Sequence, residues 1–241
     1  MAELNNEVGR ESLYESIANR LEQMILNDSV QIDERLPSEP VLAVSFGVSR
    51  PVIREALKLL KERGLINQRQ GGRTVICEPN SSHLTSPMNR VVQMKNVSAL
   101  QIFEIRVALE RLSATLAAQY ATQDDIDDLR RINREMQENR NDLNARAQGD
   151  LCFHRRIAEI SRNPLLLMFI ESIGELLTEM IRVTLHAVQM QSDGVNYHER
   201  IIRTLEMNDP KKADDVMHQH LMLSMRNYEV AMRQQEEKHE E

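Results

Sequence analysis

The run from Ser49 to Arg63 constrains the fold most strongly, because it reads as one amphipathic helix with a defined start and end. Ser49 can act as the N-cap, and a proline in the first turn is tolerated because the amides there have no intrahelical partner. Gly64 lies just past the end, where glycine commonly terminates a helix. An apolar stripe and a row of cations run along this helix. The stripe is Ile53, Leu57 and Leu60, and the cations are Arg50, Arg54, Lys58 and Lys61.

The segments around this helix predict a winged helix-turn-helix domain. A short helix at residues 38–46 precedes it, and Gly47-Val48 form the tight turn between the two helices. Downstream, strand-like runs at residues 65–70 and 73–76 flank Gly71-Gly72, which is a hairpin signal. A helical apolar period at residues 11–27 supplies the third helix of the core. The predicted domain spans residues 1–77, with residues 1–10 as a mobile leader.

Cationic charge is concentrated in this region. From Arg50 to Arg73 there are seven Lys or Arg residues against two Glu, a local balance of +5 in a chain of net charge -7. Phosphate neutralisation needs such a local patch rather than a basic whole chain, and arginines at the start of a helix can reach guanine edges in the major groove. The alternative is a solvated charged helix in an ordinary bundle, but the turn and the wing together favour DNA binding.

The rest of the chain predicts a mainly α protein. Residues 78–97 are rich in Pro, Ser and Asn and are interpreted as a linker. Residues 98–235 are predicted to form an all-helical antiparallel bundle, and the glutamate-rich residues 236–241 to fray. One long helix is expected at residues 165–188, an interruption at Asp193-Gly194, and a helix from Asn196 to Met207. No apolar run is long enough to span a membrane and the N-terminus lacks a signal peptide, so we expect a cytoplasmic protein.

Polar residues of the helical half suggest a metal site. Asp150 and His154 are four residues apart on one predicted helix, so their side chains project in the same direction. His198 and His220 lie in helices on either side of a turn, and antiparallel packing could bring both to this pair. Such a set suits a divalent transition metal. Spacing does not settle the question, since three histidines on three helices are more often surface or hydrogen-bonded core residues, and His218 points inward as readily as His220.

The N-terminal motifs resemble the winged-helix signature of the GntR family of bacterial transcription regulators. The matching motifs are Leu36-Pro37-Ser38-Glu39, Gly47-Val48-Ser49-Arg50, Arg54-Glu55-Ala56-Leu57, Gly64-Leu65 and Gly71-Gly72-Arg73-Thr74. The resemblance implies operator contacts by Ser49, Arg50, Arg54 and Gly71, and Lys58 and Arg73 extend this basic surface. One departure is Pro40, which stands where family members usually carry a DNA-contacting arginine.

The helical half resembles the FCD-type ligand domain of the FadR subgroup of that family. The resemblance is carried by Asp150-Leu-Cys-Phe-His154, Asn163-Pro164, His198 before Ile201-Ile202, and His220-Leu221. It implies a metal bound by Asp150, His154, His198 and His220, with zinc expected first and nickel or manganese as alternatives. It also implies that Arg106, within Glu104-Ile-Arg-Val-Ala-Leu-Glu110, binds the effector. The alternative for Arg106 is a surface ion pair with Glu110.

These motifs together predict a homodimeric, ligand-responsive transcription regulator that is not an enzyme. It would bind a palindromic operator in double-stranded DNA and be released, as a repressor, by a small carboxylate such as a sugar acid or organic acid. A constitutive DNA binder whose helical domain only dimerises is one alternative. A metalloenzyme is another, less favoured because no base-bearing metal motif such as His-Glu-x-x-His is present.

Overall fold

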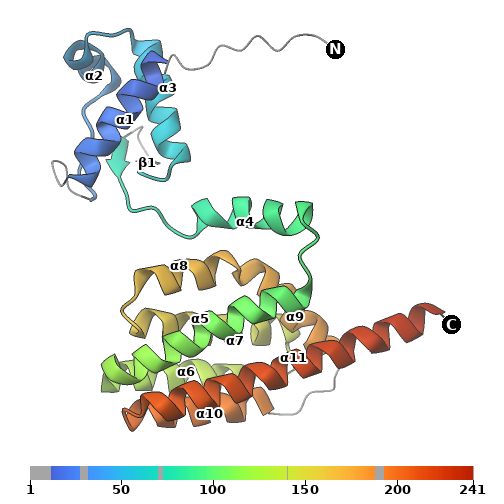
Figure 1. The fold of residues 1–241 in the computed structure, drawn as a ribbon. Coiled ribbons are helices and arrows are strands. Elements are labelled where there is room, and N and C mark those ends of the chain that lie inside the picture. The colour runs from blue at the N-terminus through green and yellow to red at the C-terminus, as the bar shows by residue number, and fades with distance from the viewer. Residues whose placement is uncertain (1–11, 28–31, 70–72, 140, 188–192, 241) are drawn as a thin grey trace. The chain divides into compact units, whose positions relative to one another are not determined.

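The computed structural model describes residues 12–27, 32–69, 73–139, 141–187 and 193–240. The chain divides into two compact units, the first ending at His83 and the second beginning at Leu84. Figure 1 shows that helices dominate both, and that a small hairpin belongs to the first. The expected mainly α fold, with a winged helix-turn-helix unit followed by a helical unit, is confirmed.

The first unit contains the expected helices and wing. Its elements are α1 (Leu13–Leu26), α2 (Glu39–Phe46), α3 (Arg50–Glu62), β1 (Ile66–Arg69) and β2 (Arg73–Ile76). The two strands pair antiparallel, with Ile66 opposite Ile76 and Arg69 opposite Arg73. Between α2 and α3, Gly47 adopts a left-handed conformation with φ 66°, which a residue without a Cβ adopts at least cost. Ser49 stands at the N-cap of α3, although its side chain makes no capping hydrogen bond.

The core of this unit forms where α3 crosses α1. Ile53, Ala56 and Leu60 are buried on one side of α3, while Leu57 is half-buried. The opposing residues are Ile17, Ala18 and Leu21 of α1 and Ile76 of β2. Burying this apolar face leaves the opposite face of α3, which carries the cations, in solvent.

The segment predicted as a linker contains a helix. Helix α4 (Ser82–Met94) occupies most of residues 78–97 and includes Pro87. Pro and Ser content suggested an irregular linker, but Met88 packs against a cluster around Phe103 of the second unit. Such tertiary contacts outweigh weak local preferences.

Beyond α4, the second unit is a bundle of seven helices within the described residues. They are α5 (Ala99–Tyr120), α6 (Gln123–Glu138), α7 (Leu143–Ile160), α8 (Pro164–Ser172), α9 (Gly174–Ala187), α10 (Asp193–Glu206) and α11 (Pro210–Glu240). Helix α11 packs along α5, α9 and α10, while α7 packs against α5, α6 and α9 (Figure 1). The principal core has Phe153 and Ile157 of α7 at its centre, with Ile201 of α10 and Met217 of α11.

Three details of this bundle differ from the prediction. The long helix expected at residues 165–188 is divided at Ile173 into α8 and α9. Helix α10 already includes Asp193 and Gly194, which were expected to interrupt the chain. Helix α11 continues to Glu240, so residues 236–240 are helical rather than frayed.

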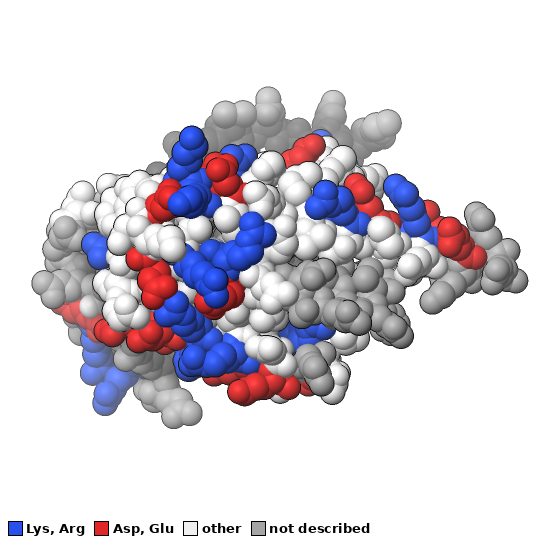
Figure 2. All heavy atoms as spheres, turned by 90° about the horizontal axis from the view of Figure 1, so that it is seen from below, with Lys and Arg blue, Asp and Glu red and all other residues white. Residues whose placement is uncertain are grey.

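The outer surface of the helical unit carries charges of both signs. On the face shown in Figure 2, Lys and Arg side chains lie among Asp and Glu side chains. The ion pairs of this unit include Arg111 with Asp214 at 2.6 Å and Arg130 with Glu206 at 2.7 Å. Within the described residues, no helix is both long and apolar enough to cross a membrane.

Candidate metal centre and DNA-binding surface

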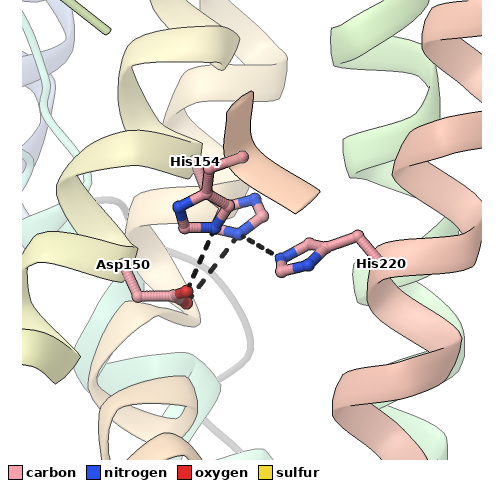
Figure 3. Close-up of side chains that lie close together, drawn as sticks. Asp150, His154 and His220 are labelled. Carbon is pink, nitrogen blue, oxygen red and sulfur yellow. Dashed lines mark hydrogen bonds and ion pairs between the residues drawn. The ribbon is translucent and has the colours of Figure 1, made fainter. Parts of the chain in front are cut away.

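Four potential metal ligands meet inside the helical unit. Asp150 and His154 project from α7, His198 from α10 and His220 from α11. One ligand atom from each lies within 4.8 Å of the ligand atoms of the other three. Figure 3 shows Asp150, His154 and His220 pointing toward one another. Of the two histidines that the sequence left open on α11, it is His220 that faces this cluster.

The spacing of these atoms suits a single ion. The Nε2 atoms of His154 and His220 are 3.2 Å apart, and Asp150 Oδ1 is 3.4 Å from His198 Nε2. Asp150 Oδ2 is 3.8 Å from His154 Nε2. Ligands held about 2.0–2.2 Å from one ion lie roughly 3–4 Å from one another. The side chains are therefore already arranged at the distances that coordination requires.

The ring nitrogens of these histidines are buried, so leaving them without a hydrogen-bond or metal partner costs free energy. His154, His198 and His220 are all buried. Both ring nitrogens of His198 and Nδ1 of His220 have no hydrogen-bond partner among the described residues. A buried polar atom left unsatisfied typically costs about 1–3 kcal/mol, which a bound ion would offset at His198 Nε2. The residues thus fit a metal ion.

Two further side chains support the cluster from α5. Arg106 is only 1% exposed, and its Nε donates to Glu110 Oε1 at 2.7 Å. The other oxygen of Glu110, Oε2, contacts Nδ1 of His154. An ionised carboxylate can only accept a hydrogen bond, so the contact favours the tautomer in which Nδ1 carries the proton and Nε2 is free to bind metal. Arg106 also donates to Asp150 Oδ2 at 3.5 Å.

His198 is held by ring stacking. The rings of Phe153 and His198 lie nearly parallel, with centroids 3.9 Å apart and an interplanar angle of 11°. Phe153 is fully buried and adjoins His154 on α7. The same hydrophobic core therefore orients two of the histidines.

Electrostatics favours the protonation states that a metal requires at Asp150, His198 and His220. Burial raises the pKa of Asp150, but His154, His198 and Arg106 together bring this pKa well below its usual range. Burial lowers the pKa of His198, and it lowers the pKa of His220 further, with added repulsion from His198 and His154. The carboxylate is therefore anionic, and His198 and His220 are neutral, near pH 7.

A small cavity opens beside the cluster. Asp150 and His220 form part of its wall, and the volume open to the centre of a water molecule is about 60 Å³. Its other described lining residues include Arg146, Ile181, Thr184, Leu223, Ser224 and Asn227. Polar and apolar groups thus face the same space, as is usual in small-molecule sites.

The predicted effector-binding arginine lies outside this lining. Arg106 was expected either to face the pocket or to form a surface pair with Glu110. The ion pair with Glu110 is present, but it is buried rather than on the surface. Arg106 lies beside Asp150 and is not part of the described lining of the cavity.

The residues proposed to contact DNA lie on the exposed side of the first unit. Arg50, Arg54 and Lys58 are exposed on α3. The side chain of Arg54 is 67% exposed and donates to Glu39 of α2 at 3.1 Å, so it would exchange this partner for DNA. Lys58 lies 3.9 Å from Glu55 of the same helix.

The wing contributes a further cation. Arg73 is exposed at the start of β2, while Gly71 lies outside the described residues. Pro40 is exposed near the start of α2, at the position where the family pattern has arginine.

Sequence reasoning did not assign Glu110 and Arg146 to the site. Glu110 was recognised only as a possible surface partner of Arg106, because periodicity could not show that His154 lies on its other side. Arg146 precedes Asp150 by four residues on α7, so the helical spacing that joined Asp150 to His154 could have identified it.

Comparisons with known proteins agree with this architecture. Residues 13–76 match the family described as bacterial regulatory proteins, gntR family, and residues 101–222 match the FCD domain. A solved structure described as Streptococcus agalactiae GntR superposes with a TM-score of 0.65 at 26% identity, covering 89% of this chain and 100% of that one.

Two characterised bacterial relatives are transcription regulators. The HTH-type transcriptional regulator LutR of Bacillus subtilis (strain 168) is 31% identical over 204 residues, which is 82% of this chain and 93% of LutR. The HTH-type transcriptional repressor NanR of Escherichia coli (strain K12) is 29% identical over 220 residues, which is 89% of this chain and 83% of NanR. The metalloenzyme alternative is therefore not supported. The chain belongs to the GntR family of bacterial transcription regulators and carries an FCD domain as its helical, ligand-responsive unit.

Proposed function

We propose that the protein is a dimeric repressor that binds a palindromic operator and is released by a small carboxylate bound at a metal centre. The observation that carries this proposal is the convergence of Asp150 with three buried histidines beside a cavity. A basic recognition helix in the same chain supplies the DNA-binding half of the activity.

Zinc is the ion that we expect first. Three imidazole nitrogens and one carboxylate oxygen are ligands that zinc accepts, and nickel and manganese also bind such mixed sets. When bound, the ion would act as a Lewis acid that attracts the carboxylate of an effector. Glu110 would hold His154 in the required tautomer, and Phe153 would fix the ring plane of His198.

The recognition surface is expected to read the operator through α3 and the wing. Arg50 and Arg54, in the first turns of α3, would approach base edges in the major groove. Lys58 and Arg73 would neutralise phosphates, and Ser49 and Gly71 would allow close approach of the backbone. The similarity to the repressor NanR supports repression as the direction of control.

Effector binding would weaken operator affinity only if the effector prefers the DNA-free state of the protein. A preference of about 1–3 kcal/mol would change operator affinity roughly 5- to 150-fold. The cavity shares Asp150 and His220 with the metal cluster, which supports a direct connection between effector and ion.

The first experiment is to measure the metal content of the purified protein. Near-stoichiometric metal is expected in the wild type, and its loss is expected in His154→Ala and His220→Ala. His218→Ala is the matched control, because His218 lies on the same helix but outside the cluster, and this variant should keep its metal.

The metal-loaded protein would then be titrated with operator DNA in the presence of short carboxylic acids. Release of DNA by an acid in the wild type, but not in metal-free variants, is the expected result. Metal that is absent even after reloading with zinc, nickel or manganese would overturn the metal centre. DNA binding that no acid affects would favour a constitutive binder whose helical unit only dimerises.

A further inference from the structure

The three histidines of the cluster are supported in different ways. His154 has Glu110 at its Nδ1 atom. His198 is stacked on Phe153. His220 has no hydrogen-bond partner at Nδ1 among the described residues, and its Nε2 faces that of His154 at 3.2 Å (Figure 3). A bound ion would replace this last contact, because both Nε2 atoms would then bind metal. The orientation of the His220 ring therefore depends strongly on packing against neighbouring side chains.

Tyr197 contacts His220 from the neighbouring helix. The ring centroids of Tyr197 on α10 and His220 on α11 are 5.8 Å apart, and the two ring planes are inclined by 40°. Tyr197 is half-buried, whereas His220 is only 4% exposed. The contact therefore joins a buried candidate ligand to an aromatic side chain that reaches the surface.

Arg200 in turn contacts the tyrosine. Its guanidinium carbon lies over the Tyr197 ring, 4.5 Å from the centroid, which is a cation–π arrangement. Its Nη2 donates a hydrogen bond to Oε1 of Gln219 at 2.9 Å. Gln219 directly precedes His220 on α11. Tyr197, Arg200 and Gln219 thus form a continuous set of contacts around His220, which we call the latch.

We propose that Tyr197 is a positioning residue for His220 and that the latch sets the rate at which the metal is released. This inference rests on the metal centre proposed above. To leave the ion, the His220 side chain must change rotamer, and the ring of Tyr197 is packed against it in its present one. Displacing a packed aromatic ring that is itself held by Arg200 raises the barrier to this movement. His220 is therefore the ligand through which the ion would be lost.

The test measures how fast zinc leaves the full-length protein. Zinc-loaded protein is mixed with a chelator whose absorbance changes on binding zinc, in enough excess that the rate no longer depends on chelator concentration. Tyr197→Ala should release zinc at least about tenfold faster than the wild type, a typical effect on metal binding of a residue that supports a ligand. Tyr197→Phe should keep the wild-type rate, because the ring rather than the hydroxyl makes the contact.

A second variant tests the latch without removing the ring. Arg200→Ala truncates an exposed side chain, so the fold should be kept. It should accelerate zinc release by a smaller factor than Tyr197→Ala, because the tyrosine remains in contact with His220. If Tyr197→Ala does not fold, a wild-type release rate in Arg200→Ala overturns the latch, and faster release supports it.

Tyr120 provides the matched control. Its ring also has an arginine over it, with the guanidinium carbon of Arg162 5.0 Å from the centroid. Tyr120 lies at the end of α5 and is not part of the cluster. Tyr120→Ala should therefore release zinc at the wild-type rate.

Cobalt(II) in place of zinc separates positioning from a general loss of stability. Its visible absorption depends on the number and geometry of the ligands. In Tyr197→Ala the absorption should change, because water replaces the imidazole of His220 in part of the molecules. Tyr197→Phe and Tyr120→Ala should keep the wild-type spectrum.

Each contrary outcome has a distinct meaning. A wild-type release rate in Tyr197→Ala, or an equal acceleration in Tyr120→Ala, overturns the latch while the metal centre stands. Faster release from Tyr197→Ala with an unchanged cobalt spectrum overturns the positioning of His220. Wild-type protein that binds neither zinc nor cobalt overturns the metal centre, and the latch with it.

Discussion

At the scale of single residues, Glu110 is the side chain whose role changes most between sequence and structure. It links the buried Arg106 to Nδ1 of His154 and so fixes which ring nitrogen faces the cluster. Partners of this kind behind metal-bound histidines commonly contribute 10–100-fold to metal affinity. The buried ion pair on α5 is therefore expected to support the site rather than to contact the effector directly.

Replacing Glu110 with Gln should weaken zinc affinity by roughly 10–100-fold. The amide keeps the shape of the side chain but removes the charge that favours a proton on Nδ1 of His154. Competition with a coloured chelator measures this change directly. Glu104→Gln, an exposed position on the same helix, is the control and should not affect the affinity. A Glu110→Gln variant with wild-type zinc affinity would show that the contact does not position His154.

Arg54 allows a second prediction at this scale. Its side chain is largely exposed, so truncation removes little packing. Arg54→Ala should weaken the binding free energy for the operator by about 1–3 kcal/mol, the value of a bidentate base contact. The free energy of unfolding should stay within ~0.5 kcal/mol of the wild type. Fluorescence anisotropy with operator and scrambled duplexes distinguishes specific from general binding. Unchanged preference for the operator would remove Arg54 from base recognition.

At the scale of elements, the end of the recognition helix depends on a glycine for two reasons. Gly64 has φ 76°, and a Cβ at this position would overlap with the imidazole ring of His83. The carbonyl of Gly64 also accepts a hydrogen bond from the thiol of Cys77 at 3.2 Å. This residue therefore ends α3 and lets the chain after the wing pass close to it.

Gly64→Ala should destabilise the first unit by more than Gly47→Ala. Gly47 has a similar φ of 66° but no atoms within 4 Å of the added Cβ, so its substitution measures the backbone cost alone, about 1–2 kcal/mol. The additional loss of stability in Gly64→Ala, compared with Gly47→Ala, should diminish when His83 is also changed to Ala. Thermal unfolding of these three variants, the single His83→Ala variant and the wild type provides the comparison. Equal losses at both glycines would mean that the His83 ring moves aside without cost.

The elements also show where sequence reasoning succeeded and where it could not. The caps and apolar period of residues 49–64 are local signals, and α3 begins and ends where they predict. The division at Ile173 was missed although Gly174 follows it, because the apolar spacing of Leu166, Ile170, Ile173 and Leu177 continues across the break. Helix α4 was missed because its Pro and Ser content outweighed the apolar spacing of Leu84, Met88 and Val92.

The candidate site was predictable in part for the same physical reason. Helical spacing joined Asp150 to His154, but no pattern within a helix shows which residues on other helices lie opposite. His198, His220 and Glu110 reach the cluster through the packing of α10, α11 and α5, which is a property of the folded bundle. The assignment of two of these residues therefore rested on a family resemblance.

At the scale of the whole molecule, the helical unit exposes apolar side chains on which the proposed dimer could form. Ile105 and Leu112 lie exposed on α5, and Leu165 and Phe169 lie exposed on α8, which packs against α5. These pairs are spaced seven and four residues apart, so each lies along one face of its helix. A two-fold interface uses the same patch on both partners, and a palindromic operator requires such symmetry.

Introducing a charge into this patch should separate the dimer. Ile105→Arg is expected to give a monomer in light scattering, with operator affinity at least about tenfold lower because two linked half-site contacts become independent. Met207→Arg is the control, since Met207 is an exposed apolar residue at the end of α10. A dimeric Ile105→Arg variant with normal operator affinity would place the interface elsewhere.

The proposed metal ligands lie next to residues of the principal core along their helices. The supply of metal should therefore affect the stability of the helical unit as well as effector binding. His154 lies beside Phe153, His198 lies one turn from Ile201, and His220 adjoins Leu221. An ion bound by these histidines would therefore link α7, α10 and α11, three of the helices that the core joins. Ligand binding of this kind stabilises the folded state by about 2.7 kcal/mol at a hundredfold excess over Kd. Starvation for the ion would then expose the helical unit to proteolysis and lower the amount of regulator in the cell.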